Sequence, residues 1–554
     1  MSRKPQVVQS SATVGAVCAQ HNLLALDKNN VIRVPFLIKG QLRVPEIVSI
    51  GVIEAAFAEK ELGAGPADAK ATHCRIGQTQ VLREPVIDRQ TLKQTGEYTY
   101  SAMPLVTADE LIERDVDGLA DELYNLPVDA ILEFVDGVRQ AILVDGDFVH
   151  QVRENTRKTA EQPDHWHDAG FAAIPMLFNR QEILKGIDTD LSVWGIPGSR
   201  LLEEWQPVDA PIMPMPVHML ADTLFGNDER RFVPRRARLR ATPTRQLHIT
   251  AGNTPQIPII SALRAISTKS PAVVKSPFGA TTPGALLALA AVAAAPDHPL
   301  TRHLSIVYWR GGDEEIESDL FIPDAFDRII VWGAPDAVLS LKSRTLFTKV
   351  LTFNPCYGVS LIGREAFHDD LMPIAIRVCC DALVANQKAC IATQVIYVEG
   401  DDAQLEALAK TVQQVLAQFD QAAPNILKPS QIGEVKRLMK GRFLDADWYV
   451  NERDGFFTSG VVVAKDEFDI ALHPMCRMII LSKVKDLAET SVRMHHGVST
   501  VSIYPRERYL SLRNRIAARG VSNVLELGHS GSVFSGQSHD GMMVLSELVD
   551  WKNG

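Results

Sequence analysis

The order of apolar and polar positions is most regular from residue 245 onward, where short β-branched runs alternate with longer apolar segments of helical spacing. The segments of helical spacing predict helices at 256–266, 283–295, 314–321 and 336–341. The β-branched runs predict strands at 246–251, 272–275, 304–309, 328–332 and 358–362. Strands that alternate with helices indicate a parallel sheet covered on both faces, which binds ligands at the carboxyl ends of its strands.

The first 240 residues are less regular. Residues 31–50 predict two short strands around a turn at Lys39-Gly40, whereas residues 1–30 carry no motif. Residues 107–143 have apolar positions spaced for one face of a helix. The proline-rich stretch 207–216 predicts either a linker or an arm that lies on a neighbouring subunit.

Composition narrows the class of protein. The chain has 554 residues, 46% of them hydrophobic and 22% charged, which is typical of a soluble protein with two or three domains. A net charge of −10 argues against nucleic acid as a main partner. The seven cysteines have no repeated spacing, so we expect a reducing, cytoplasmic setting with neither a disulfide framework nor a zinc site. No signal peptide is evident, and the longest apolar run, 285–295, is too short to span a bilayer.

One cysteine stands where a thiol could be reactive. A run of helical character from Asp381 ends in the polar pair Asn386-Gln387, then Cys390 follows, and a strand is predicted at 394–398. Only the thiolate is a strong nucleophile, and backbone N–H groups at a turn or helix end can lower the pKa of a thiol. An isolated cysteine is more often a small buried hydrophobe, so the surrounding sequence has to decide.

Three further segments give that context, although the chain lacks both G-x-G-x-x-G and the P-loop motif. They are His248-Ile-Thr-Ala251-Gly-Asn253-Thr-Pro, Ala272-Val-Val-Lys275-Ser276-Pro and Arg328-Ile-Ile-Val-Trp-Gly333. Together with the turn before Cys390 they resemble, in order and spacing, the aldehyde dehydrogenase superfamily. The resemblance is closest to the LuxC-type acyl-CoA reductases, through Asn386-Gln-Lys-Ala-Cys390, Pro474-Met-Cys-Arg477, His539-Asp540-Gly541 and the tail 545–551.

This resemblance implies an α/β fold of the aldehyde dehydrogenase type, with two doubly wound parallel-sheet domains and an oligomerisation arm. We expect an N-terminal region with the arm and the outer part of the cofactor domain at 1–240, and an NADP-binding core at 241–352. The catalytic domain with the nucleophile is expected at 353–530, and a C-terminal return segment at 531–554.

The resemblance also implies roles for individual residues. Cys390 is expected to attack an acyl thioester, and the Asn253 side chain would hold the oxyanion together with the Cys390 backbone N–H. His539-Asp540-Gly541 either forms a hairpin turn or places His539 as a proton donor. No metal is expected. The residues expected to place the nicotinamide cofactor are Lys275, Ser276, Gly333 and Ala251.

Two positions favour a reductase that uses NADPH. Where the superfamily usually keeps a glutamate to activate water, this chain has Cys356, so hydrolysis of an acyl-enzyme should be slow. Three residues after Lys275, where NAD-preferring relatives often have a glutamate, it has Phe278, which removes a charge that would repel a 2′-phosphate. NADH remains the alternative cofactor.

The expected function is reduction of an acyl thioester, a fatty acyl-CoA or an acyl-carrier thioester, to the aldehyde. The resemblance adds an acyl-protein synthetase as partner and a homo-oligomer as assembly. Two alternatives stay open, an aldehyde dehydrogenase that works oxidatively and a non-catalytic subunit that holds an acyl chain.

Overall fold

The computed structural model describes most of the chain: residues 6–8, 13–62, 72–90, 93–144, 146–160, 163–208, 216–226, 237–252, 254–333, 335–345, 348–354, 356–425, 427, 429–441, 445–465, 470, 473–532 and 535–554. At 6–8, 335–337, 340 and 429–430 it describes the backbone alone. No helix in these ranges is both long and apolar enough to cross a membrane.

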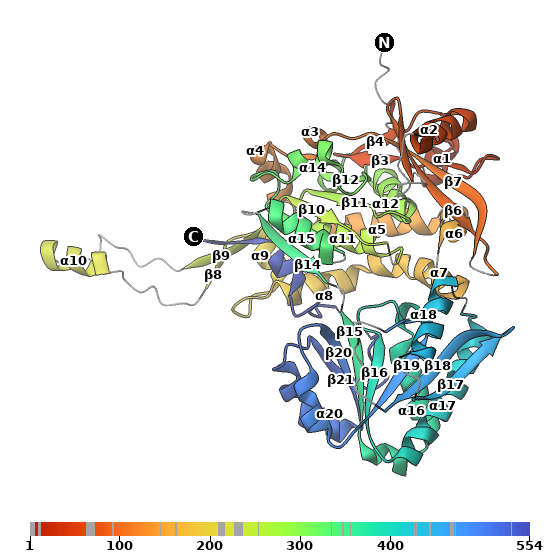
Figure 1. Cartoon of the computed structure of the whole chain (residues 1–554). Coiled ribbons are helices and arrows are strands. Elements are labelled where there is room, and N and C mark those ends of the chain that lie inside the picture. Colours follow the sequence, from red (N-terminus) through yellow and green to blue (C-terminus); the bar gives the residue numbers. More distant parts are fainter. Residues whose placement is uncertain are drawn as a thin grey trace.

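An eight-stranded sheet forms the upper body in Figure 1, with the order β1-β4-β3-β12-β11-β10-β13-β14. The five strands from β12 to β14 in that order run parallel to one another, whereas β3 joins β12 antiparallel and extends the edge with its hairpin partner β4. The predicted strands from 246 to 332 are confirmed. The bounds are β1 Gln6–Val8, β3 Phe36–Ile38, β4 Gln41–Val44, β10 Gln246–Ile249, β11 Ala272–Lys275, β12 Leu304–Val307, β13 Arg328–Trp332 and β14 Lys349–Phe353.

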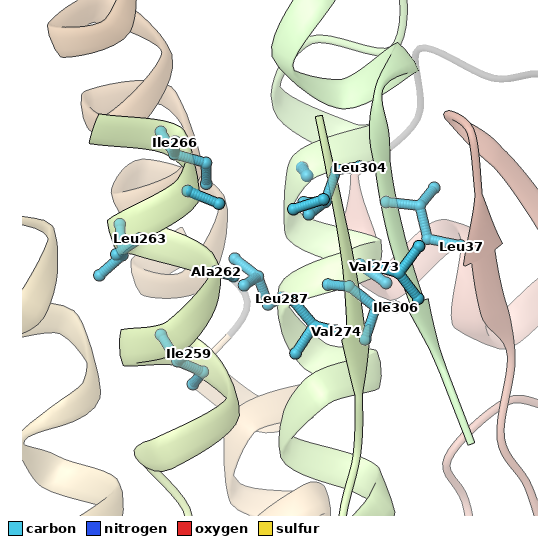
Figure 2. Packing of buried hydrophobic residues seen from close by; sticks show 14 of the residues in the cluster. Leu37, Ile259, Ala262, Leu263, Ile266, Val273, Val274, Leu287, Leu304 and Ile306 are labelled. Carbon is cyan, nitrogen blue, oxygen red and sulfur yellow. The ribbon is translucent and has the colours of Figure 1, made fainter. Parts of the chain in front are cut away.

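The core of this body lies between the sheet and its helices. In Figure 2, α11 (Ile257–Ser267) and α12 (Thr281–Ala294) direct Ile259, Ala262 and Leu287 toward the buried valines of β11. All residues of α12 from Thr281 to Val292 are buried, as expected for a helix that is apolar all round. Further helices of this body are α13 Pro299–Arg302, α14 Glu314–Leu320 and α15 Pro335–Arg344.

A second, seven-stranded sheet forms the lower body in Figure 1, with the order β17-β18-β19-β16-β15-β20-β21. All its pairs are parallel except β17 with β18, so the expected fold of two parallel-sheet domains is confirmed. The strand predicted at 358–362 belongs to this sheet, as β15. The bounds are β15 Tyr357–Ile362, β16 Thr393–Glu399, β17 Asp447–Arg453, β18 Phe456–Ala464, β19 Met478–Val484, β20 Val498–Tyr504 and β21 Asn523–Glu526, with helices α16 Leu371–Ala382, α17 Asp402–Ala422, α18 Pro429–Lys440, α19 Leu487–Thr490 and α20 Arg506–Ala517.

The N-terminal region holds more structure than its sequence pattern indicates. Residues 1–30, which carry no motif, include α1 (Val14–His21). Besides β3 and β4, residues 31–104 contain a four-stranded sheet, β2-β7-β6-β5, with α2 (Ile50–Leu62). The strands are β2 Val31–Arg33, β5 His73–Ile76, β6 Thr79–Ile87 and β7 Gln94–Pro104.

The helical character predicted over 107–143 is confirmed, but the segment is not one continuous helix. The segment divides into α3 Ala108–Leu111, α4 Val116–Leu119, a π-helical turn Ala120–Tyr124 and α5 Val128–Val144. Asp115 starts a new helix by accepting a hydrogen bond from the Gly118 N–H, and Pro127 cannot supply the N–H that a continuous helix needs. The apolar positions still face the core. The helices that follow are α6 Gly146–Thr159, α7 Asp164–Ala172, α8 Arg180–Asp190 and α9 Gly198–Glu203.

An extension leaves the upper body at a three-stranded sheet of β8 (Gln206–Pro207), β9 (Arg238–Thr242) and β22 (Asp550–Asn553), and carries α10 (Pro216–Phe225) at its end (Figure 1). Most of the stretch 207–216, for which a linker or arm was predicted, lies outside the described residues.

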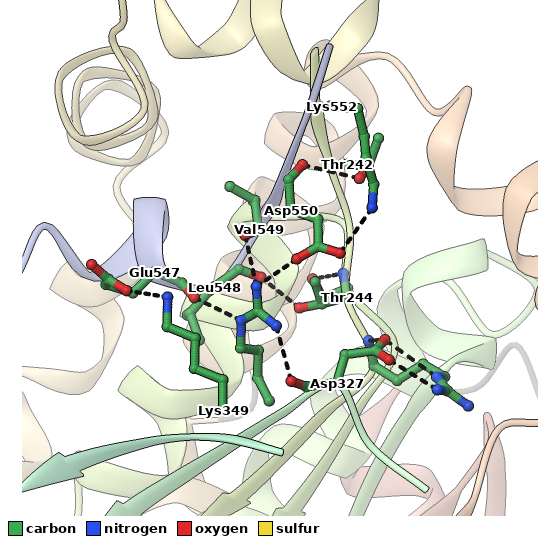
Figure 3. Close-up of polar contacts among 12 residues, drawn as sticks. Thr242, Thr244, Asp327, Lys349, Glu547, Leu548, Val549, Asp550 and Lys552 are labelled. Atoms are coloured by element: carbon green, nitrogen blue, oxygen red, sulfur yellow. Dashed lines mark hydrogen bonds and ion pairs between the residues drawn. The ribbon is translucent and has the colours of Figure 1, made fainter. Parts of the chain in front are cut away.

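The C-terminal segment returns to the upper body through β22 and is fixed there by side chains of the first sheet (Figure 3). Arg328 donates to the backbone carbonyls of Glu547 and Val549 and pairs with Asp550 at 2.5 Å. Thr244 Oγ1 donates to the Leu548 carbonyl at 2.6 Å, and Lys349 pairs with the Glu547 carboxylate. The tail therefore lies against the amino ends of β10, β13 and β14.

Candidate active site

Lys275 ends β11, at the carboxyl edge where a parallel sheet binds its ligand. Its side chain is 8% exposed, and its Nζ lies 5.4 Å from the ring centre of Tyr308 and 5.3 Å from that of Trp309. Burial lowers the pKa of this amine to about 8. No carboxylate lies within 4 Å of it among the described residues, so it is a buried cation held mainly by aromatic faces.

The segment expected to supply the oxyanion donor passes beside Lys275. Thr250 donates through both its backbone N–H and its hydroxyl to the Lys275 carbonyl, at 3.3 and 2.6 Å. Ala251 is half-buried, and a Cβ on Gly252 would meet the Phe278 carbonyl at 2.8 Å, so only glycine fits this close approach. Asn253 itself lies outside the described residues.

Ser276 and Gly333 stand at the ends of neighbouring strands. The Ser276 N–H donates to the Val307 carbonyl and so continues the hydrogen bonds between β11 and β12. The Ser276 hydroxyl is so close to Gly284 of α12 that a Cβ added to this glycine would lie only 2.4 Å from it. The Ser276 side chain therefore packs under α12. Gly333 is half-buried immediately after β13.

The turn that presents Cys390 has an unusual backbone. Ala385, Asn386 and Gln387 all have φ between 48° and 66°, within a short 3₁₀ segment that follows α16. Three successive non-glycine residues in the left-handed region cost free energy and persist only where the surroundings hold them. The opposing turn, Met475 to Arg477, is left-handed as well, with φ between 56° and 59°.

Buried side chains tie these two turns together. Gln387 donates to the Met478 carbonyl at 2.7 Å and accepts from the Met478 N–H at 3.1 Å. The fully buried Arg477 donates through Nε to Asn386 at 2.7 Å and through Nη1 to Asp420 at 2.6 Å. Asp420 also accepts from the hydroxyls of Thr458 and Ser459. Asn386 and Gln387 therefore hold the turn, and Cys390 follows it with its carbonyl bonded by Ser499 at 2.6 Å.

The electrostatic setting of the thiol differs from the expectation based on the turn. Burial, followed by the negative charge of Asp540, raises the pKa of the half-buried Cys390 to about 11. The backbone N–H groups of Cys390 and Ile391 bond the sulfur and act in the opposite direction, but more weakly. Cys356, at the position of the missing glutamate, is half-buried with its pKa also raised to about 11, so it is a neutral thiol at pH 7.

His539 lies in a tight hairpin. It forms an antiparallel bridge with Met542, and the intervening Asp540 and Gly541 have φ of 49° and 77°, so the hairpin-turn alternative describes the backbone. The imidazole packs on Phe353, and its Nδ1 bonds Arg264 Nη2 at 2.9 Å. Burial and the charge of Arg264 lower the pKa of His539 to about 3, so the ring is neutral at physiological pH.

Sequence reasoning missed two charged groups around this hairpin. Arg264 of α11 is half-buried, its guanidinium lies over the rings of Trp332 and Phe353, and its Nη1 is buried with no hydrogen-bond partner in the described part of the chain. Asp540 belongs to the segment His539-Asp540-Gly541, in which no electrostatic role was predicted for it. Burial raises the pKa of its carboxyl to about 6, and its charge acts on Cys390 and on Arg264. No local pattern in the sequence marks an arginine of an amphipathic helix as part of a site.

The match to a family model decides the relationship. The model of the acyl-CoA reductases (LuxC) matches residues 229–551, more than half of the chain. The chain belongs to the acyl-CoA reductase (LuxC) family. Similar proteins are the long-chain acyl-protein thioester reductase of Aliivibrio fischeri, 28% identical over 308 residues, and long-chain acyl-protein thioester reductase 2 of Photobacterium leiognathi, 27% identical over 313. Each match covers 55% of this chain and 62–63% of the relative, less than two thirds of its length.

Solved structures confirm the fold of this acyl-CoA reductase family member. An aldehyde dehydrogenase of Bartonella henselae matches with a TM-score of 0.61 at 14% identity, over 94% of this chain and 98% of that one. An NADP-dependent enzyme of E. coli matches with a TM-score of 0.60 at 13% identity, over 85% and 94%. The predicted family and the predicted fold are therefore both confirmed.

Proposed function

We propose that this family member reduces an acyl thioester, a fatty acyl-CoA or an acyl-carrier thioester, to the aldehyde, with NADPH as the hydride donor and Cys390 as the covalent nucleophile. The observation that carries the proposal is the turn of Cys390, a strained left-handed segment fixed by Asn386 and Gln387. Such strain is typical of functional sites. The names of the similar reductases support the same chemistry.

In the proposed reaction the Cys390 sulfur attacks the acyl carbonyl, the donor thiol leaves with a proton, and an acyl-cysteine remains. The oxyanion of each addition step would be held by the Cys390 backbone N–H and the Asn253 side chain, each such donor contributing about 3–4 kcal/mol to lowering the barrier. The bound cofactor supplies a hydride to the acyl carbon. Collapse of the resulting thiohemiacetal releases the aldehyde and restores the sulfur of Cys390.

The residues at the sheet edge fit a nicotinamide dinucleotide. Lys275 offers a buried amine at the end of β11, and Ala251, Ser276 and Gly333 lie at or just beyond the ends of adjacent strands. We assign these four residues to cofactor placement. His539 would serve as a neutral donor through Nε2, since its Nδ1 accepts from Arg264.

A second candidate function, oxidation of an aldehyde, is favoured by one observation. The position expected to hold a base is the neutral thiol of Cys356, but Asp540 from the tail is a carboxylate with a pKa of about 6 whose charge acts on Cys390. A carboxylate near the nucleophile could activate water for hydrolysis of an acyl-enzyme.

The test is incubation with a panel of acyl-CoAs and NADPH, followed by absorbance at the reduced-nicotinamide band and by intact mass. We expect NADPH consumption, aldehyde release and an acyl adduct on Cys390, all lost in Cys390→Ala and kept in Cys380→Ala, which removes an exposed thiol. Full activity of Cys390→Ala would overturn the proposal. An adduct without NADPH oxidation would favour an acyl-holding subunit, and NADP⁺ reduction with aldehyde in the absence of CoA would favour the oxidative enzyme.

We further propose a cytoplasmic homo-oligomer, with an acyl-protein synthetase as partner. Support for self-association comes from α10, whose apolar side chains are more than half exposed at the end of the extension. The exposed members are Val217, Met219, Leu220, Leu224 and Phe225.

A further inference from the structure

Two cysteines lie at the starts of neighbouring strands of the seven-stranded sheet. Cys356 comes immediately before β15 and Cys390 three residues before β16, and the two strands pair in parallel. Gly358 of β15 is in register with Thr393 of β16. Counting back along both chains from this pair places Cys356 level with Ile391, the residue after Cys390. Both thiols therefore stand at the same end of one pair of strands.

The backbones of these two segments are in close contact. The Gly358 N–H donates to the Ala392 carbonyl at 2.9 Å. A Cβ added to Gly358 would lie only 2.4 Å from the carbonyl oxygen of Ile391, so only glycine allows this approach. The segment that carries Cys356 is therefore fixed directly beside the segment that carries Cys390.

The hydroxyl of Ser499, in β20, reaches both segments. Its Oγ lies 2.6 Å from the Cys390 carbonyl oxygen and 3.5 Å from the carbonyl oxygen of Tyr357, the residue after Cys356. Neighbouring strands are about 4.8 Å apart, and a disulfide joins cysteines whose Cα atoms are about 4.4–6.8 Å apart. The backbone therefore places Cys356 and Cys390 at a separation that a disulfide can bridge.

These two thiols also share an exposure that the other cysteines do not have. Of the seven cysteines, Cys356 and Cys390 are the half-buried ones. The buried ones are Cys18, Cys74, Cys379 and Cys476, and the exposed one is Cys380. Besides burial, the charge of Asp540 raises the pKa of both half-buried thiols, and an ionised Cys356 raises that of Cys390 further. Both sulfurs are therefore within electrostatic reach of one carboxylate, and of each other.

We propose that Cys356 is a resolving thiol for Cys390, so that a hydroperoxide converts the pair into a disulfide. The peroxide oxidises the Cys390 sulfur to a sulfenic acid and is itself reduced, hydrogen peroxide giving water. The Cys356 sulfur then attacks the sulfenic sulfur. The S–S bond forms, and the hydroxyl leaves as water with the proton of Cys356. Two electrons thus pass from the two thiols to the peroxide, and a thiol reductant reverses the change.

The order of the two steps follows from the hydrogen bonds of the sulfurs. The backbone N–H groups of Cys390 and Ile391 bond the Cys390 sulfur and favour its thiolate, so this sulfur reacts first. A sulfenic acid that no thiol resolves is oxidised onward to sulfinic acid, which thiol reductants do not restore. A disulfide with Cys356 therefore keeps the sulfur of Cys390 recoverable.

The experiment treats the full-length protein with increasing hydrogen peroxide at pH 8, blocks free thiols with iodoacetamide, and maps the peptides by mass spectrometry without reduction. We expect a linked pair of peptides that carry Cys356 and Cys390, formed within one chain and lost after dithiothreitol. Cys356→Ala should lose the linked pair completely and accumulate sulfinic acid on Cys390 at peroxide doses that leave none in the wild type. Cys380→Ala, which removes an exposed thiol, should behave as the wild type.

Sulfinic acid on Cys390 with Cys356 still free in the wild type would overturn the proposal. Linkage of Cys390 to another cysteine or to a second chain would also overturn it, and so would two free thiols after complete oxidation of Cys380. The wild-type map needs no variant, so a folding defect of Cys356→Ala leaves the test intact. No step of the assay needs an acyl thioester or NADPH, so its outcome is separate from that of the thioester reductase test. Where both proposals hold, the linked protein should accept no acyl group until it is reduced.

Discussion

The link between Arg477 and the turn of Cys390 gives the sharpest test of how this site is held. Arg477 is 0% exposed and makes two hydrogen bonds, to Asn386 and to Asp420. Removing one partner of a buried charged pair typically costs about 3–5 kcal/mol. Two features reduce the loss of stability in Arg477→Met. Asp420 still accepts hydrogen bonds from the hydroxyls of Thr458 and Ser459. The substitution also removes the buried Nη2 of Arg477, which has no hydrogen-bond partner in the described residues. We therefore expect a loss near the lower end, about 3 kcal/mol.

The assay must report on the domain of the seven-stranded sheet alone, because a chain of several domains does not unfold in one transition. Hydrogen–deuterium exchange of peptides from β18 and β19 along a urea series gives a midpoint for that domain. A matched control is Arg245→Met, which breaks the part-exposed pair of Arg245 with Asp327 in the other sheet. This control should cost about 1 kcal/mol and leave the exchange of β18 and β19 unchanged.

A second readout separates holding the turn from general stability. Cys390 owes its raised pKa first to burial, so a loosened turn should expose the thiol and speed its alkylation by iodoacetamide at pH 8, measured on the Cys390 peptide. Arg477→Lys can keep the ion pair with Asp420 but loses the bond from Nε to Asn386. It should therefore cost less stability than Arg477→Met and still accelerate alkylation. A loss below about 1 kcal/mol in Arg477→Met, or an unchanged alkylation rate in both variants, would refute this reasoning.

Three further predictions concern charge and assembly. Asp540→Asn removes a carboxylate whose pKa is about 6 and whose negative charge raises the pKa of Cys390. Alkylation of Cys390 should therefore be faster in this variant at pH 8 and unchanged at pH 5, and equal rates of variant and wild type at pH 8 would contradict this. Burial raises the pKa of Glu84 from 4.5 to about 7. The buried carboxylate therefore lowers the free energy of unfolding at neutral pH; this destabilisation is absent in acid and grows as the pH rises from 4.5 to about 7. Glu84→Gln should thus stabilise by up to about 3 kcal/mol at pH 8 and little at pH 5, by calorimetry; the same gain at both pH values would contradict the assignment. Leu224→Asp with Phe225→Asp should reduce the mass by light scattering if α10 is buried between subunits, and an unchanged mass would exclude α10 from the contact.

The central sheet was predictable because its strands are buried on both faces. Runs such as 272–275 and 328–332 show nearly continuous β-branched residues, and the all-apolar α12 can lie only in a core. The division of 107–143 was not predictable from periodicity, because the apolar face continues across the breaks while Asp115 and Pro127 interrupt the backbone. The four-stranded N-terminal sheet was missed because its strands bury polar and charged residues, such as Arg83 and Glu84 of β6, so the apolar pattern typical of a strand is weak there.

The candidate site shows the same division between local and distant information. The position of Lys275 at a strand end follows from its own segment, and so does the hairpin at Asp540-Gly541. The left-handed turn before Cys390 does not, because the residue that holds it, Arg477, comes 91 positions after Asn386. The direction of the Cys390 pKa also depends on distant groups. Backbone N–H groups favour the thiolate, yet burial and the tail carboxylate outweigh them.

The tail hairpin links the two halves of the site through adjacent residues. His539 packs against Phe353 and Trp332, at the ends of β14 and β13 in the eight-stranded sheet, and bonds Arg264. Its neighbour Asp540 acts electrostatically on Cys390 of the other domain. The two residues are adjacent in one tight turn, closed by the bridge between His539 and Met542. The tail that Arg328 and Thr244 hold in place therefore carries both the ring that packs at the carboxyl ends of β13 and β14 and the charge that acts on Cys390.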